Sequence, residues 1–318
     1  TLLSTISHWH ASLDKRKHIT CAYIDFSRAF DSKPHNLLIW KCESLGIKGC
    51  LLRWILSFLS NRTQTVCVEN SMSAPFPVSS GVPQGSCLGP LLFSIYISDV
   101  PTVHPSGTYC SMYADDLKIY CINNPTLRQA AMDNLVVWST KWGLTLSPTK
   151  TVVMLIGSNH PACKITALGA DLPIVNCIKD LGVSYNKKLA FSTHFDEIIG
   201  KASARCSFIH RSFQSRSITI YSKLFSTYVR PLLEYCSELW NPGTLTDIAR
   251  IEKVQRRFTR IVFSRCGLPP SPYRDRLKTL ELHSLSDRRT HSDLLTCFKI
   301  IFGHLDINCR SFFNISTR

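Results

Sequence analysis

The chain has 318 residues, of which 44% are hydrophobic and 19% are charged, and its formal net charge at pH 7 is +15. This composition excludes intrinsic disorder as the default expectation, and the length suffices for one sizeable domain plus a smaller one. No apolar run approaches 18 residues and no basic-then-apolar signal pattern opens the chain, so neither a membrane-spanning nor a secreted protein is supported.

The first half of the chain is predicted to mix strands with helices. Residues 20–26 form an apolar run with the length of a buried strand, and a helical pattern covers residues 34–45, where Pro34 suits a first helical turn. Further elements are expected at 51–59 (helix), 63–69 (half-exposed strand), 88–97 (helix), 115–116 (hairpin turn), 126–142 (helix), 151–156 (strand) and 179–184 (strand). This order predicts an α+β sheet domain.

After about residue 192 the pattern becomes mainly helical. Apolar residues recur at helical spacing between Phe195 and Ile209, and residues 248–263 form a second amphipathic segment whose other face is basic. The apolar stripes predict a helical core, whereas the basic face suits either solvent or nucleic acid. The sequence Pro-Pro-Ser-Pro at 269–272 is the best candidate for a linker.

The positive charge is concentrated in the second half of the chain. Residues 1–160 carry 13 Lys and Arg against 9 Asp and Glu, and residues 161–318 carry 24 against 13. Such an excess can contact phosphates and bind nucleic acid without reading its sequence, and this binding weakens with salt. A solvated helical surface remains the alternative interpretation.

The 14 cysteines are scattered, and the closest pair is Cys42 and Cys50. This spacing excludes a zinc knuckle or a thioredoxin-type motif, so reduced cysteines are expected. The sequence also contains no Gly-x-Ser-x-Gly elbow, no phosphate-binding Walker loop and no His-Glu-x-x-His motif.

Acidic residues follow two of the expected strands. Asp25 lies at the end of the first strand, and Asp115 and Asp116 lie between two apolar runs. Because side chains alternate along a strand, adjacent acids can approach one centre only where the backbone turns, as in a tight hairpin. With Asp25 on a neighbouring strand, the three carboxylates can hold two hard divalent cations, Mg²⁺ or Mn²⁺.

A loop punctuated by glycine and proline, Gly81-Val82-Pro83-Gln84-Gly85, directly precedes the expected 88–97 helix. Such a loop lets backbone and a side-chain amide approach a nucleotide, although a turn that starts a helix would have the same composition.

Three motifs in this order resemble the reverse transcriptases of non-LTR (LINE-type, jockey-like) retrotransposons. They are Ala22-Tyr23-Ile24-Asp25-Phe26-Ser27-Arg28-Ala29-Phe30-Asp31-Ser32, the 81–85 loop and Tyr113-Ala114-Asp115-Asp116. The match continues through residues 142–151, 179–183 and 228–235, and thus covers nearly the whole chain. The resemblance implies a polymerase palm with residual fingers, built as a mixed or antiparallel sheet with packed helices, at 1–190, a helical thumb at 191–245 and a basic helical C-terminal region at 246–318.

The resemblance also implies an RNA-directed DNA polymerase that transfers nucleotides to a primer 3′-hydroxyl with two Mg²⁺ (or Mn²⁺) ions. The implied catalytic residues are Asp25, Asp115 and Asp116, which would hold the metal, and Lys150 as general acid toward pyrophosphate. The implied nucleotide-binding residues are Phe26, Phe30, Gln84 and Gly85, with Phe30 screening the sugar 2′-carbon, and the implied primer grip is Leu181, Gly182 and Val183. Asp31 is expected to cap the following helix rather than to bind metal.

The expected partners are an RNA template, a DNA primer or target DNA and dNTPs, with nuclear action by family analogy and no membrane. Several departures from the family are evident. Only 24 residues precede Asp25 and the first residue is not Met, so a partial chain without the family's fingers segment is expected. Lys33 replaces a usual apolar residue, and Ser147 replaces a usual Asn. A non-catalytic nucleic-acid-binding remnant and an inert relic that does not fold stably remain as alternatives.

Overall fold

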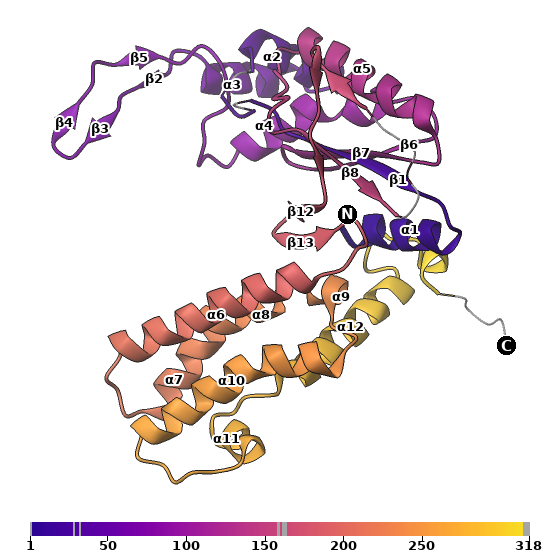
Figure 1. Cartoon of the computed structure of the whole chain (residues 1–318). Coiled ribbons are helices and arrows are strands. Elements are labelled where there is room, and N and C mark those ends of the chain that lie inside the picture. The colour runs from indigo at the N-terminus through magenta and orange to yellow at the C-terminus, as the bar shows by residue number, and fades with distance from the viewer. Residues whose placement is uncertain (1, 28, 32, 158–159, 161–163, 314–318) are drawn as a thin grey trace. The chain divides into compact units, whose positions relative to one another are not determined.

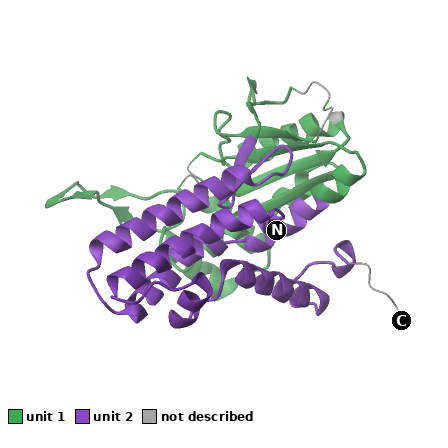
Figure 2. Ribbon diagram, turned by 60° about the horizontal axis from the view of Figure 1, so that its bottom comes forward, with its two compact units in different colours: residues 1, 9–176 green, residues 2–8, 177–318 purple. Residues whose placement is uncertain are grey.

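The computed structural model describes residues 2–27, 29–31, 33–157, 160 and 164–313. The chain divides into two compact units, residues 1 and 9–176 (unit 1) and residues 2–8 and 177–318 (unit 2), coloured separately in Figure 2. No helix in the described part of the chain is long and apolar enough to cross a membrane. The 13 cysteines within the described ranges are free.

Unit 1 is built on a five-stranded sheet with the order β11-β8-β1-β7-β6 (Figure 1). The strands are β1 (Ile19–Ile24), β6 (Thr108–Tyr113), β7 (Asp116–Ile122), β8 (Val152–Ile156) and β11 (Ile174–Val175). β1 pairs antiparallel with both β7 and β8, and β11 pairs parallel with β8. The central position of β1 explains its apolar sequence, because both of its faces are covered. The expected mixed sheet is confirmed.

Helices pack on this sheet around a hydrophobic core. The helices are α1 (Leu2–Asp14), which runs from unit 2 into unit 1, α2 (His35–Ser44), α3 (Gly49–Leu59), α4 (Gly89–Ile97), the 3₁₀ helix Val100–Val103, and α5 (Pro125–Lys141). Ala22 and Ile24 of β1 share one buried cluster with Phe93 of α4 and Leu135 of α5. α5 begins where predicted, because the Asn124 side chain accepts the amide of Leu127.

Residues 63–69 do not form the single strand that alternation predicted. β2 (Thr63–Gln64) pairs with β5 (Phe76–Pro77), and β3 (Cys67–Val68) pairs with β4 (Ser71–Met72), which gives the long arm seen in Figure 1. All eight of these strand residues are exposed. The prediction was wrong because neither face of the arm packs on a core, so the alternation of apolar and polar residues there does not mark a buried face.

Unit 2 begins with a hairpin and continues as helices. The elements are β12 (Cys177–Asp180), β13 (Val183–Asn186), α6 (Ser192–Ser212), α7 (Ile218–Leu224), the π-helical turn Phe225–Val229, α8 (Arg230–Glu234), α9 (Ser237–Trp240), α10 (Leu245–Arg265), α11 (Tyr273–Thr279), α12 (Leu285–Ile301) and the 3₁₀ turn Cys309–Ser311. The single strand predicted at 179–184 is in fact this hairpin, because Leu181 and Gly182 both adopt positive φ angles and reverse the chain.

The boundary between the units falls at residues 176 and 177, and residues 269–272 lie inside unit 2 between α10 and α11. That proline-rich segment is therefore a turn between two helices and not a linker between domains. The β12–β13 hairpin groups with the helices because Val183 and Tyr185 are buried in unit 2 and Ser184 donates to Glu197 of α6. The assignment of palm, thumb and C-terminal region to particular ranges stays a prediction.

Candidate active site

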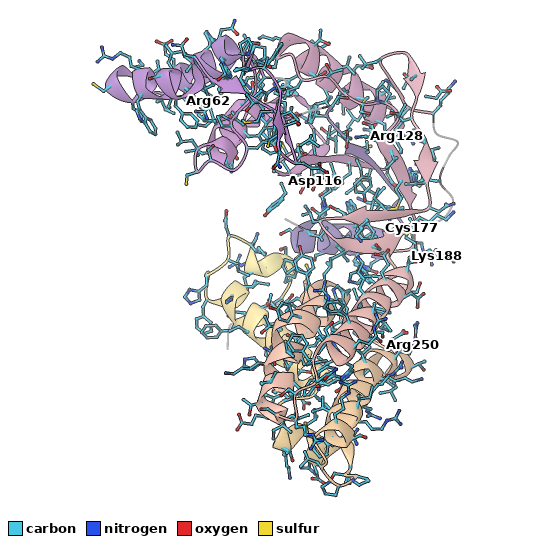
Figure 3. All side chains as sticks on the ribbon, turned by 90° about the vertical axis from the view of Figure 1, so that its left-hand side faces the viewer. Arg62, Asp116, Arg128, Cys177, Lys188 and Arg250 are labelled. Atoms are coloured by element: carbon cyan, nitrogen blue, oxygen red, sulfur yellow. The ribbon has the colours of Figure 1, made fainter. Side chains whose placement is uncertain are left out.

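The register of the central strands brings two of the predicted acids together. Ile24 of β1 lies opposite Leu117 of β7, and extending this antiparallel register by one residue sets Asp25 opposite Asp116. Residues opposite each other on neighbouring strands lie about 5 Å apart. Asp116 is labelled in Figure 3, at the start of β7. The sheet therefore places two carboxylates from distant parts of the sequence side by side.

The third acid lies in the turn that joins β6 to β7. Tyr113 pairs with Asp116, which leaves Ala114 and Asp115 as a two-residue connection. Ala114 has a φ of 53°, in the left-handed region that a residue with a Cβ rarely adopts. The expected tight hairpin is confirmed. Asp115 lies in the turn and Asp116 begins β7, so the two acids are adjacent in sequence but do not both lie on a regular strand.

Asp25 is held by the segment that precedes β8. Its amide donates to Thr151 Oγ1 at 3.2 Å, and its carbonyl accepts from the Ser147 amide at 2.9 Å. Lys150 Nζ lies 3.9 Å from Asp25 Oδ1, although the Lys150 side chain is 71% exposed. The structure thus brings the predicted Lys150 to the predicted Asp25. Sequence reasoning did not single out Thr151, and it treated Ser147 only as a departure from the family.

Asp25, Asp115 and Asp116 have the donor atoms that a divalent cation prefers, and they lie at adjoining positions of the sheet. Asp25 Oδ1 is buried and accepts no hydrogen bond from the described residues, and Lys150 Nζ at 3.9 Å is too distant to donate one, so a cation beside it would satisfy this oxygen. Oxygen-only donors suit Mg²⁺ or Mn²⁺. Within the described ranges, however, no three His, Cys, Asp or Glu residues converge closely enough to hold a metal ion. The three acids occupy two facing strand ends and the adjoining turn, and their side chains do not form a closed metal cage in the described part of the chain.

The predicted nucleotide loop is bonded to the chain that follows Asp25. The amides of Gly81 and Val82 donate to the carbonyls of Lys33 and Phe30 at 2.8 and 2.9 Å. A Cβ on Gly81 would lie 2.6 Å from the Asp31 Cα, so only glycine permits this approach. The loop and the end of β1 therefore belong to one bonded assembly.

Gln84 in this loop binds Asp31. Its Nε2 donates to Asp31 Oδ1 at 2.8 Å. The expectation that Asp31 caps the following helix was wrong, because Pro34 occupies the N-cap of α2 and no side chain caps it. Asp31 lies three residues upstream of that position and turns to the loop instead. Gly85 has a φ of 78° with open space around it, so the loop backbone is accessible there.

The ring of Phe30 lies flat on Phe93. Their centroids are 4.3 Å apart with an interplanar angle of 23°. Lys33 Nζ lies 3.8 Å from the Phe93 centroid and 4.8 Å from the Phe30 centroid. Lys33 is fully buried, and burial lowers its pKa to about 7 against the opposing charges of Asp31 and Asp115. Phe30 is thus fixed in orientation and remains partly exposed.

Phe26 is placed differently from Phe30. Its ring is 8% exposed in the core of unit 1, and its centroid is 6.4 Å from that of Trp138. A nucleotide contact by Phe26 stays a prediction, and the burial of the ring leaves only its backbone for that contact.

The predicted primer-grip residues form the turn of the β12–β13 hairpin in unit 2. Tyr235 Oη donates to the Leu181 carbonyl at 3.0 Å. Gly182 has a φ of 86°, and a Cβ there would lie 3.3 Å from the Tyr235 ring. Val183 is buried. The turn is therefore fixed against α8 and its neighbours within unit 2, and its contact with a primer stays a prediction.

Comparison with known proteins identifies the family of the chain. Residues 3–191 match the family described as reverse transcriptase (RNA-dependent DNA polymerase). The chain is 27% identical over 272 residues to a probable RNA-directed DNA polymerase from transposon BS of Drosophila melanogaster, which covers 80% of this chain and 30% of the relative. It is 25% identical over 264 residues to the RNA-directed DNA polymerase from mobile element jockey of the same species, which covers 78% and 29%. The chain thus spans about 30% of the length of these relatives.

A solved structure shares the fold. Apo telomerase from Candida tropicalis superposes with a TM-score of 0.50 at 14% identity, over 99% of this chain and 55% of that chain. At this identity the likeness concerns the fold alone, and it agrees with the expected α+β polymerase architecture.

Proposed function

The chain belongs to the reverse transcriptase (RNA-dependent DNA polymerase) family, and we propose that it extends a primer by RNA-templated DNA synthesis as the reverse transcriptase domain of a non-LTR retrotransposon protein. One observation carries this proposal: Asp116 lies opposite Asp25 in the extended register, with Asp115 in the adjoining turn. Two facing strand ends and an adjoining turn residue supply three carboxylates from which a shared cation site could be built.

Asp25, Asp115 and Asp116 would hold two Mg²⁺ or Mn²⁺ ions. Such ions, when bound, lower the pKa of a primer 3′-hydroxyl and neutralise charge on the leaving pyrophosphate. The side chains hold the reacting groups in place, which is the main contribution that a protein makes to phosphoryl transfer. Lys150 would donate a proton to the pyrophosphate, and its position 3.9 Å from Asp25 Oδ1 with an exposed side chain supports this role.

The nucleotide would lie between the 81–85 loop and the ring of Phe30. Gln84 and Gly85 are exposed, and Phe30 is held flat by its stacking on Phe93, so its outer face is a fixed wall. A wall at the sugar would exclude a 2′-hydroxyl and so select dNTPs over rNTPs. Leu181, Gly182 and Val183 would hold the primer end.

The nucleic acid partners would be an RNA template and a DNA primer or target DNA, with action in the nucleus. Basic residues on the outer face of α10 support phosphate contacts, because Lys253, Arg256, Arg257 and Arg260 are all exposed. Contacts of this kind give binding that is sequence-independent and sensitive to salt.

Primer extension tests the proposal. The purified chain is incubated with a DNA primer on an RNA template, dNTPs and Mg²⁺, beside Asp116→Ala and the control Asp14→Ala, which removes an exposed acid at the end of α1. We expect extension by the wild type and the control, and a loss on the order of 10²-fold or more in Asp116→Ala. Extension that survives in Asp116→Ala would contradict the assignment of the site.

The charge of unit 2 favours a second candidate, a nucleic-acid-binding remnant without catalysis. It predicts no extension by any variant, together with RNA binding that falls steeply with salt and is unchanged by Asp116→Ala. A broad, non-cooperative thermal melt would instead indicate a relic that does not fold stably.

A further inference from the structure

We propose that Asp31 is a positioning residue of the nucleotide site, which holds Gln84 so that the carbonyl oxygen of its amide faces the substrate. This inference rests on the proposed function. It assigns to Asp31 a role that differs from helix capping and from metal binding.

The direction of the Gln84 amide follows from the chemistry of its partner. An ionised carboxylate only accepts hydrogen bonds, so the atom 2.8 Å from Asp31 Oδ1 must be Gln84 Nε2. The reversed amide would set Oε1 against Oδ1, and two acceptors at that distance repel each other. The Gln84 nitrogen is therefore bound to Asp31, and Oε1 accepts no hydrogen bond from the described residues.

Asp31 is itself held in place. Ser80 Oγ donates to its carbonyl at 2.8 Å, and the amides of Val82 and Gly81 donate to the carbonyls of Phe30, the residue before it, and Lys33, two residues after it. Because these bonds tie the loop to the segment after β1 at both ends of the contact, the carboxylate and the glutamine keep their relative position. Figure 1 shows the start of α4, which follows the loop, beside the sheet that carries β1.

The advantage of this arrangement is order at an exposed side chain. Gln84 is exposed, and a free glutamine would sample several rotamers and both amide orientations. A donor on the incoming nucleotide or on its base pair would then meet the acceptor only part of the time. Asp31 removes that freedom before the substrate binds, which strengthens binding without adding a contact.

Steady-state primer extension with five proteins tests the role. They are the wild type, Asp31→Asn, Asp31→Ala, Gln84→Ala and the double variant Asp31→Ala/Gln84→Ala. Asn has nearly the shape of Asp but can donate or accept, so Asp31→Asn keeps the packing and loses the amide direction. We expect both Asp31 variants to raise the KM for dNTP about 3- to 10-fold with kcat nearly unchanged, as for a lost hydrogen bond that acts in binding.

The double variant decides whether Asp31 acts through Gln84. We expect the KM of the double variant to equal that of Gln84→Ala alone, because Asp31 can have no further effect once the Gln84 side chain that it positions is absent. If the fold-increases in KM of the two single variants multiply in the double variant, the substitutions act independently and the proposal is overturned. Wild-type kinetics in Asp31→Asn would also overturn it. Asp14→Asn serves as a control for the loss of an exposed carboxylate.

A second measurement does not need turnover. In protein labelled with ¹⁵N in glutamine side chains, the Gln84 amide signal is identified by its absence in Gln84→Ala. We expect dATP with Mg²⁺ to shift this signal, and Asp31→Asn to require about 3- to 10-fold more dATP for the same shift. If the wild type extends no primer but this difference is found, the proposed function fails and the positioning role stands. Equal titrations in wild type and Asp31→Asn would overturn the positioning role.

Discussion

Lys33 Nζ lies 3.8 Å from the centroid of the Phe93 ring, in a side chain that is fully buried and has no hydrogen-bond partner among the described residues. The same nitrogen lies 4.8 Å from the centroid of the Phe30 ring. Two aromatic faces therefore replace part of the solvation that the ammonium group loses on folding. The substitution of Lys for the usual apolar residue is accommodated next to the candidate site, but at a cost in stability.

Lys33→Met should stabilise the protein near neutral pH. Burial lowers the pKa of Lys33 from 10.5 to about 7, so the unfolded chain binds this proton more tightly than the folded chain. The resulting penalty is complete below about pH 7, declines as the pH rises and is absent above about 10.5. We expect Lys33→Met to raise the free energy of unfolding by about 2 kcal/mol at pH 6.5, and by much less at pH 10.

Urea unfolding at several pH values measures this difference, with the exposed Lys15→Met as control. A gain that does not depend on pH would mean that the cost at Lys33 arises from its shape and not from its charge.

Lys41 of α2 forms an ion pair with Asp99, and the loss of one partner should destabilise the protein more than the loss of the other. Lys41 is 3% exposed, its Nζ lies 2.5 Å from Asp99 Oδ1 and 3.9 Å from the Trp142 centroid, and the Asp99 side chain is 38% exposed. Asp99→Asn leaves a buried ammonium without its counter-charge, whereas Lys41→Met leaves an apolar chain against Trp142. We expect Asp99→Asn to cost about 2 kcal/mol and Lys41→Met about 1 kcal/mol.

The double variant Lys41→Met/Asp99→Asn should lose less free energy of unfolding than the two single variants lose together. Urea unfolding at pH 7 measures this difference. Strict additivity would show that the pair contributes no coupling.

The sequence predicted the strand and turn positions of the three acids, whose features are local. Asp25 follows an apolar strand, and Asp115 with Asp116 lies in a short turn, so length and alternation were sufficient to place the carboxylates. Asp31 could not be assigned in the same way, because its partner Gln84 is 53 residues away and Asp just before a helix is more often a cap. The pairing depends on Gly81, whose close approach to Asp31 exists only in the folded chain.

Misassigned strands have a similar origin. At 179–184 the chain reverses at Leu181, a residue without turn propensity that adopts a φ of 46°. The turn is stabilised by Tyr235, which donates to the Leu181 carbonyl from 54 residues away. No local pattern records such a bond, so the hairpin looked like one continuous strand.

His210 should make unit 2 sensitive to acid. It is 7% exposed, neither ring nitrogen has a hydrogen-bond partner in the described part of the chain, and its ring centroid is 4.7 Å from that of Phe258. Burial lowers the pKa of His210 from 6.5 to about 4, and Arg265 and Arg257 act in the same direction. Between these pH values the unfolded chain binds a proton that the folded chain does not, so stability falls as the pH falls, by up to about 1.4 kcal/mol per pH unit.

His210→Phe keeps an aromatic ring beside Phe258 and removes the titrating group. Free energies of unfolding measured from pH 7 to pH 4 should decline less steeply in this variant than in the wild type. The exposed His291→Phe is the control and should retain the wild-type slope. Parallel curves for wild type and His210→Phe would assign the acid sensitivity to other groups.

Gly81→Ala should separate the nucleotide loop from the end of β1. An added Cβ would lie 2.6 Å from the Asp31 Cα and 2.7 Å from the Phe30 carbonyl, both backbone atoms, and the φ of 83° is itself unfavourable for alanine. Gly85→Ala in the same loop is a matched control, because its φ of 78° is similar but nothing lies within 4 Å of the new Cβ. We expect Gly85→Ala to cost about 1 kcal/mol and Gly81→Ala about 3 kcal/mol by urea unfolding. The difference between the two measures the clash alone, so equal costs would show that the loop does not pack on Asp31 in solution.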